Sequence, residues 1–167
     1  MPLTPKLISS PERERWLNKH VPYRIQILRG LEAYNASGGP DGLMRHVFPN
    51  IFESTLMACR WTMSFLGLRF TRKTGMLREV TKRREETDIF SIDLGGTLIE
   101  PTKLPQSDLD LLGTVFKAAN VGSAHPGQEG AHSMTPEQVG PAAILLISKT
   151  KVHLYDILGR PVPTWKG

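Results

Sequence analysis

The stretch Ile51–Phe70, IFESTLMACRWTMSFLGLRF, decides the fold of this chain. Asn50 precedes it as a natural helix cap, and Glu53 follows three residues later, at the spacing of a capping box. An apolar stripe recurs along the stretch at helical spacing: Phe52, Leu56, Cys59, Met63, Leu66 and Phe70. Four further apolar residues widen this stripe: Met57, Trp61, Phe65 and Leu68. The pattern predicts a helix over Asn50–Phe70 that packs against other helices at the centre of the fold.

Three further helices are predicted, one before this stretch and two after it. Ser10 and Pro11 suit the start of a helix, and Pro22 should break or kink it. Ser107 opens another helix with acidic residues in its first turn, and Thr135 with Gln138 has capping-box spacing. The expected ranges are Ser10–Tyr34 with a break near Pro22, Ser107–Asn120 and Thr135–Leu158.

Three segments permit a second interpretation. Ala142–Ile147 and Lys151–Leu154 could be two strands, since short apolar runs are ambiguous, and Ile89–Leu94 suits a short strand or an extended connection. With helices in the majority, the fold class expected is mainly α. We predict one domain over residues 1–167, an antiparallel four- to five-helix bundle with an irregular basic insertion.

Composition and charge narrow the classes of function. Cys59 is the single cysteine, so no internal disulfide can form, which fits a reducing compartment. The longest apolar stretch is interrupted by Arg60 and Arg69 and is too short to cross a bilayer, and the first ten residues do not resemble a signal peptide. We therefore expect a cytoplasmic protein without a membrane partner. The net charge of +5 favours acidic partners such as RNA.

A basic stretch after the central helix is the candidate nucleic-acid-binding surface. It lacks interleaved aromatic residues, so base stacking is not indicated, and a solvated helix face is the alternative interpretation. The residues predicted to track a phosphate backbone are Arg72, Lys73, Arg78, Lys82, Arg83 and Arg84.

Three other patterns are interpreted as structural. The segment Asp93–Leu98, DLGGTL, resembles the phosphate loop of hexokinase-like sugar kinases and the nucleophile motif of haloacid-dehalogenase-like phosphatases. It lies past mid-chain and Gly95 replaces the second aspartate, which favours a simple Gly-Gly turn. His125, Glu129 and His132 match no zinc motif, and Cys59 suits the core. No metal and no cofactor are therefore expected.

The end of the third predicted helix carries the most specific pattern. It runs Phe116-Lys-Ala-Ala-Asn120-Val-Gly-Ser-Ala-His125 and is followed by a further apolar helix. This arrangement resembles the HEPN domain, a helical bundle common in toxin–antitoxin and abortive-infection systems. The resemblance implies a polar residue at Asn120 and a catalytic histidine at His125. The arginine of that motif is replaced by Ala119, so the cation that stabilises the transition state is missing.

Two hypotheses of function follow from these patterns. The first is a non-enzymatic, HEPN-like binding or assembly module of a bacterial defence or toxin–antitoxin system, with a second copy of the chain, RNA or another acidic molecule as partner. The second is a divergent metal-independent HEPN ribonuclease in which His125 is the base and Asn120 its polar neighbour. The absence of the motif arginine favours the first hypothesis.

Overall fold

A computed structural model describes residues 3–36, 44–71, 74–124 and 134–164. These residues are mainly helical, with a small two-stranded sheet. In chain order the elements are α1 (Ser10–Arg15), α2 (Val21–Leu28), α3 (Gly30–Ala36), α4 (Met44–Phe65), β1 (Leu68–Thr71), β2 (Met76–Glu79), α5 (Gln106–Ala124) and α6 (Pro136–Thr150).

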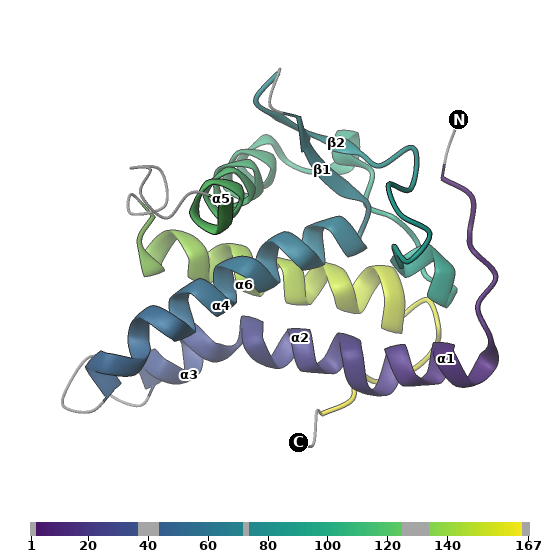
Figure 1. Cartoon of the computed structure of the whole chain (residues 1–167), viewed down its shortest axis with the longest axis horizontal. Coiled ribbons are helices and arrows are strands. Elements are labelled where there is room, and N and C mark those ends of the chain that lie inside the picture. Colours follow the sequence, from purple (N-terminus) through teal and green to yellow (C-terminus); the bar gives the residue numbers. More distant parts are fainter. Residues whose placement is uncertain (1–2, 37–43, 72–73, 125–133, 165–167) are drawn as a thin grey trace.

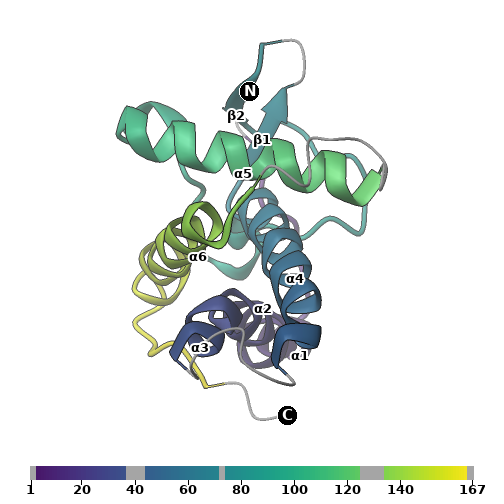
Figure 2. The same ribbon diagram turned by 90° about the vertical axis from the view of Figure 1, so that its left-hand side faces the viewer.

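The helices form layers that meet at α4 (Figure 1). Helices α1, α2 and α3 form one row, and α4 and α6 both run in the opposite direction to that row. Helix α5 lies across α4 and α6, beside the hairpin of β1 and β2, as the rotated view shows (Figure 2). Helix α4 contacts α2, α3, α5 and α6, which is the central place predicted for it. The α1–α3 row and the pair α4 and α6 therefore run in opposite directions, while α5 crosses them.

The stripe on α4 forms the core, as predicted. Four residues of the stripe, Leu56, Cys59, Met63 and Leu66, lie in one buried cluster together with Leu112, Phe116 and Leu146. Phe52 is partly buried and packs against that cluster. The 3.6-residue period identified the face of α4 that the other helices cover.

The bounds of α4 differ from the prediction at both ends. The helix begins at Met44, so Asn50 is an interior residue and not the cap, and Pro49 lies inside the helix. It ends at Phe65 and not at Phe70, because Gly67 adopts a left-handed φ of 86° that reverses the chain. The segment Leu68–Thr71 then pairs as a strand with Met76–Glu79, so the basic insertion contains an antiparallel hairpin that the sequence analysis did not predict.

The first and last helical segments continue through wide turns. Pro22 does not break the N-terminal segment, because the π-helical turn Trp16–His20 precedes it and the Val21 N–H donates to the Trp16 carbonyl, five residues back. Residues 142–154 are helical, which excludes the two-strand alternative, and α6 continues into a second π-helical turn, Lys151–Tyr155. Ser91–Leu94 forms a 3₁₀ helix where a strand or an extended connection was predicted, and a further 3₁₀ turn covers Pro101–Lys103.

In the described part of the chain, no helix combines the length and the apolar character that spanning a membrane requires.

Candidate arginine groove

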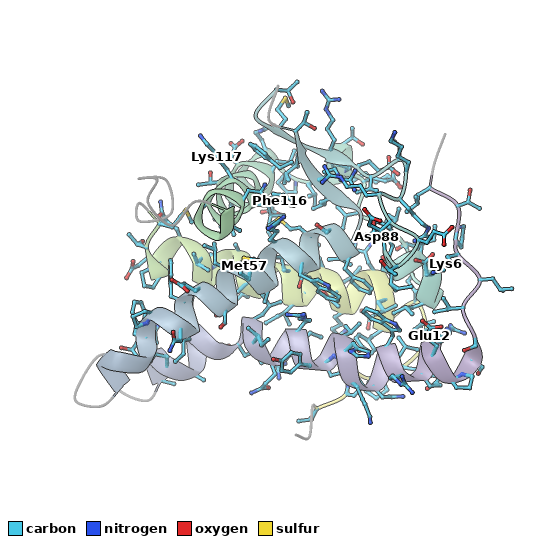
Figure 3. The ribbon with its side chains drawn as sticks, viewed as in Figure 1. Lys6, Glu12, Met57, Asp88, Phe116 and Lys117 are labelled. Atoms are coloured by element: carbon cyan, nitrogen blue, oxygen red, sulfur yellow. The ribbon has the colours of Figure 1, made fainter. Side chains whose placement is uncertain are left out.

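A groove of about 740 Å³ lies beside the C-terminal half of α4. Its floor is the C-terminal half of α4, and its walls come from β1, the loop of residues 80–90, α5 and the side chain of Trp16. Phe116 of α5 and Asp88 of the loop, both labelled in Figure 3, lie above that half of α4 and line the groove. We call this site the groove.

Arginine side chains dominate the charge of the groove. Arg60, Arg69 and Arg84 line it, and among the described lining residues Asp88 carries the opposing negative charge. Partial burial and the nearby Arg84 guanidinium lower the pKa of Arg69, while Asp88 acts in the opposite direction. Arg69 also faces Arg78 across the hairpin, where like charges on paired residues repel. The groove therefore holds more positive than negative charge.

Aromatic rings form the apolar part of the groove. The rings of Trp61 and Phe65 are stacked with centroids 5.1 Å apart, and Trp16 lies parallel to Trp61 at 6.3 Å. Phe70 stacks on Phe116 at 6.1 Å, which joins β1 to α5. Trp16, Trp61 and Phe70 are each half-buried, so part of each ring faces the solvent. An anionic ligand with flat rings would find both charge and apolar contact here.

The predicted basic stretch separates into different environments. Arg72 and Lys73 lie outside the described residues. Arg78 and Lys82 are exposed, and Arg84 lines the groove. Arg83 is turned away into an ion pair with Asp93 and is not part of an open cationic surface.

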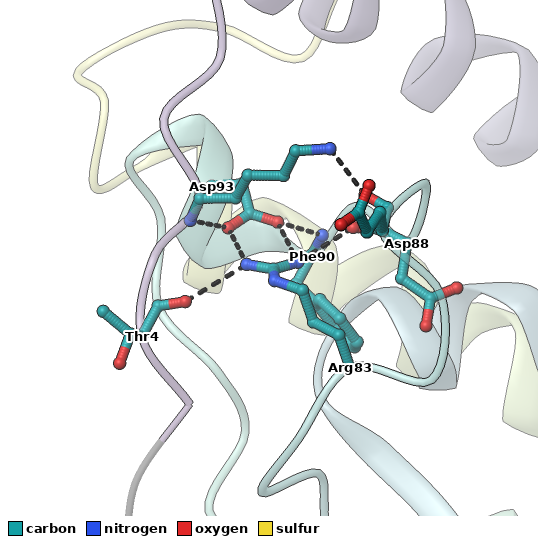
Figure 4. Close-up of polar contacts among 7 residues, drawn as sticks. Thr4, Arg83, Asp88, Phe90 and Asp93 are labelled. Atoms are coloured by element: carbon teal, nitrogen blue, oxygen red, sulfur yellow. Dashed lines mark hydrogen bonds and ion pairs between the residues drawn. The ribbon is translucent and has the colours of Figure 1, made fainter.

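Arg83 and Asp93 form the centre of a buried polar junction (Figure 4). The Arg83 guanidinium donates to both carboxylate oxygens of Asp93, to the Asp88 carbonyl at 2.8 Å and to the Thr4 carbonyl at 3.1 Å. The Asp93 carboxylate, which is fully buried, also accepts the Phe90 N–H at 2.7 Å and the Lys6 N–H at 2.6 Å. We call these contacts the Arg83–Asp93 junction.

The junction explains the phosphatase-like and kinase-like motif. Asp93 is occupied by Arg83 and two backbone amides, so its carboxylate does not face an open phosphate site. Gly95 adopts a φ of 87°, and a Cβ on Gly96 would collide with the His153 carbonyl. The two glycines allow a tight turn packed against the end of α6, which agrees with the structural interpretation.

The candidate HEPN residues are only partly described. Asn120 lines the groove together with the arginines. His125 lies outside the described residues, so its position relative to Asn120 is not given. Ala119, at the motif's arginine position, is completely buried in the core, and Lys117 is exposed on the outer side of α5 (Figure 3). An arginine at position 119 would therefore point into the core and not into the groove.

Metal and thiol chemistry have little support in the described residues. No group of three or more histidine, cysteine, aspartate or glutamate side chains gathers there, and His125, Glu129 and His132 all lie outside them. Burial raises the pKa of the Cys59 thiol to about 12, so this thiol is not ionised at neutral pH. Cys59 is a core residue, as the sequence indicated.

The contribution of α4 to this site was not predicted from the sequence. Arg60, Trp61 and Ser64 lie one helical turn or less apart, on the edge of the apolar stripe, and all line the groove. An arginine beside a tryptophan at the border of a buried stripe was the available signal. The hairpin that carries Arg69 back over α4 was not predicted, so Arg69 was not expected to lie near Arg60 and Trp61.

No protein family, no curated protein and no solved structure matches this chain.

Proposed function

We propose that the chain is a non-enzymatic binding module whose groove takes a single-stranded segment of RNA. The observation that carries the proposal is the convergence of Arg60, Arg69 and Arg84 beside half-buried aromatic rings. Arginine suits this task because its planar guanidinium binds phosphate oxygens in pairs and also packs on flat rings.

Electrostatics support an anionic ligand. Arg84 lies close enough to disfavour the charge of Arg69, and Arg78 lies opposite Arg69 in the hairpin. A bound phosphate would relieve this repulsion. Release of counterions from the RNA would add to the affinity at low salt.

The shape and the lining of the groove favour a single strand. It is open to solvent, and its walls present Trp16, Trp61 and Phe70 as half-buried rings. Bases of a single strand can reach such rings, whereas those of a duplex are stacked inside the helix. Contact between a base and an aromatic ring contributes about 1–3 kcal/mol.

A titration of fluorescein-labelled oligo(U) RNA, followed by anisotropy at low salt, tests the proposal. We expect the double variant Arg69→Gln/Arg84→Gln to bind at least about tenfold more weakly than the wild type. The matched control is Lys19→Gln/Arg29→Gln, which removes the same charge from exposed positions outside the groove lining. Equal losses in both variants would show nonspecific charge attraction, and no binding by the wild type would refute the proposal.

A HEPN-like ribonuclease is the second candidate function, and one observation favours it. Asn120, the polar residue of the HEPN-like pattern, lines the same groove as three arginines, which could supply the cation that Ala119 does not. In this reading His125 activates the 2′-hydroxyl of RNA held in the groove. Gel analysis of RNA incubated with the wild type and with His125→Ala separates the two functions. We expect intact RNA with both, whereas cleavage lost in His125→Ala would make the protein an enzyme.

The HEPN-like identity, the role in bacterial defence, the cytoplasmic location and the homodimer stay predictions. Sedimentation velocity at micromolar concentration would test the dimer.

A further inference from the structure

The N-terminal segment lies across the loop that forms one wall of the groove. Residues Leu3–Ser9, which we call the strap, run along the outside of the molecule before α1 begins (Figure 1). The Lys6 N–H donates to Asp93 at 2.6 Å, and the Lys6 ammonium donates to the Glu86 carbonyl at 2.5 Å. The strap is thereby bonded to positions 80 and 87 residues further along the chain.

Apolar contact also holds the strap. Leu3 is only 7% exposed and packs with Val80 and Phe90 in a small cluster separate from the main core. Val80 and Phe90 both line the groove. The strap therefore packs against Val80 and Phe90, two residues that also line the groove.

The Arg83–Asp93 junction connects the strap to the groove wall. Arg83 donates to the Thr4 carbonyl of the strap and to the Asp88 carbonyl of the wall, and its guanidinium lies 5.1 Å from the centre of the Phe90 ring. The Asp88 carboxylate in turn accepts the backbone N–H of Arg84 at 3.0 Å. One chain of contacts thus runs from the strap to the backbone that carries Arg84.

We infer that the strap acts as a latch for the groove, with Arg83 and Asp93 as positioning residues. The docked strap completes the bonding of Asp93, and Asp93 with Arg83 holds the loop in the shape that presents Arg84 to the ligand. Docking of the strap and binding of RNA are therefore coupled, and each favours the other by the same factor. This inference rests on the proposed RNA-binding function.

Hydrogen exchange in the wild-type protein tests the coupling without a mutation. Protection of the Lys6 amide, followed by NMR, reports on how often the strap leaves Asp93. We expect saturating oligo(U) RNA to raise this protection several-fold and to leave the Arg29 amide, bonded to Ile25 in α2, unchanged. Equal protection of Lys6 in free and RNA-saturated protein would overturn the latch.

Two variants at position 6 give a matched comparison. Lys6→Pro and Lys6→Ala both remove the ammonium group, but only proline also removes the N–H that Asp93 accepts. We expect Lys6→Pro to bind the RNA about five- to tenfold more weakly than Lys6→Ala, since a hydrogen bond to a buried charge is lost. A strap with a purely structural role would lower the melting temperature of Lys6→Pro and leave its affinity equal to that of Lys6→Ala.

The outcomes separate the latch from the proposed function. If the wild type binds RNA and both position-6 variants bind equally well, the latch is wrong and the RNA-binding groove stands. If the wild type does not bind RNA at low salt, the proposed function fails and the latch has no site to control. If Lys6→Pro does not fold, the exchange measurement on the wild type decides.

Discussion

Arg83 and Arg84 are neighbours in the sequence but occupy opposite environments. Arg83 is mostly buried and donates to a carboxylate and two carbonyls in the junction. Arg84 is exposed and lies in the groove close to Arg69, a second arginine. In the junction the acceptors surround one cation, whereas in the groove the cations outnumber the acid that lines it. The first arrangement stabilises a fold, and the second is the basis of the proposed binding of RNA.

The largest loss of stability is expected from an arginine introduced at a position that neither hydrogen-bond acceptors nor water can reach. Ala119→Arg would place a guanidinium at a position that is completely buried. An unpaired buried charge and the lack of space should cost at least about 4 kcal/mol of unfolding free energy or prevent folding. Urea denaturation measures this. A folded Ala119→Arg protein within about 1 kcal/mol of the wild type would show that position 119 can open toward solvent.

Breaking the junction should have the next largest effect. Asp93→Ala leaves Arg83 without its carboxylate and two backbone N–H groups without their acceptor. We expect a loss of about 3–5 kcal/mol, as for other buried ion pairs with one partner removed. Thermal unfolding of Asp93→Ala and of Asp93→Asn checks this.

The asparagine variant is the control for shape. Its amide oxygen can keep one of the accepted hydrogen bonds, so it should lose less stability than the alanine variant. Loss of under about 1 kcal/mol in Asp93→Ala would mean that the junction does not hold the loop.

Removing a groove arginine should barely change stability. Arg84→Gln takes away an exposed charge that disfavours the charge on Arg69. We expect the free energy of unfolding to stay within about 0.5 kcal/mol, shifted upward if at all, while RNA affinity falls. Chemical denaturation and anisotropy on the same sample check both parts. A loss above about 1 kcal/mol would place Arg84 among the stabilising residues and weaken the comparison with Arg83.

The sequence predicted the parts of the fold that depend on local periodicity. The stripe through Leu56, Cys59 and Met63 identified the core face of α4, and the Thr135 capping box located the start of α6. The predicted end of α4 was wrong, because the turn at Gly67 depends on pairing between Leu68–Thr71 and a strand further along the chain.

The candidate site was harder to predict for the same reason. Arg84 was identified as a candidate, but the aromatic rings of the groove come from several elements, among them α4, β1 and α5, and only the tertiary fold brings them to Arg84. Arg83 had the same sequence environment as Arg84, and their roles are separated by the tertiary contacts of Arg83 with Asp93, Asp88 and Thr4.

The salt dependence of RNA binding tests the central claim most directly. The logarithm of the association constant for oligo(U) RNA is measured against the logarithm of salt concentration. The slope falls by about 0.7 for each lost contact to a single strand. The account predicts that Arg69→Gln/Arg84→Gln flattens the wild-type slope by about 1.4, whereas Lys19→Gln/Arg29→Gln leaves it nearly unchanged. The same slope in the wild type and in the groove variant would contradict the account.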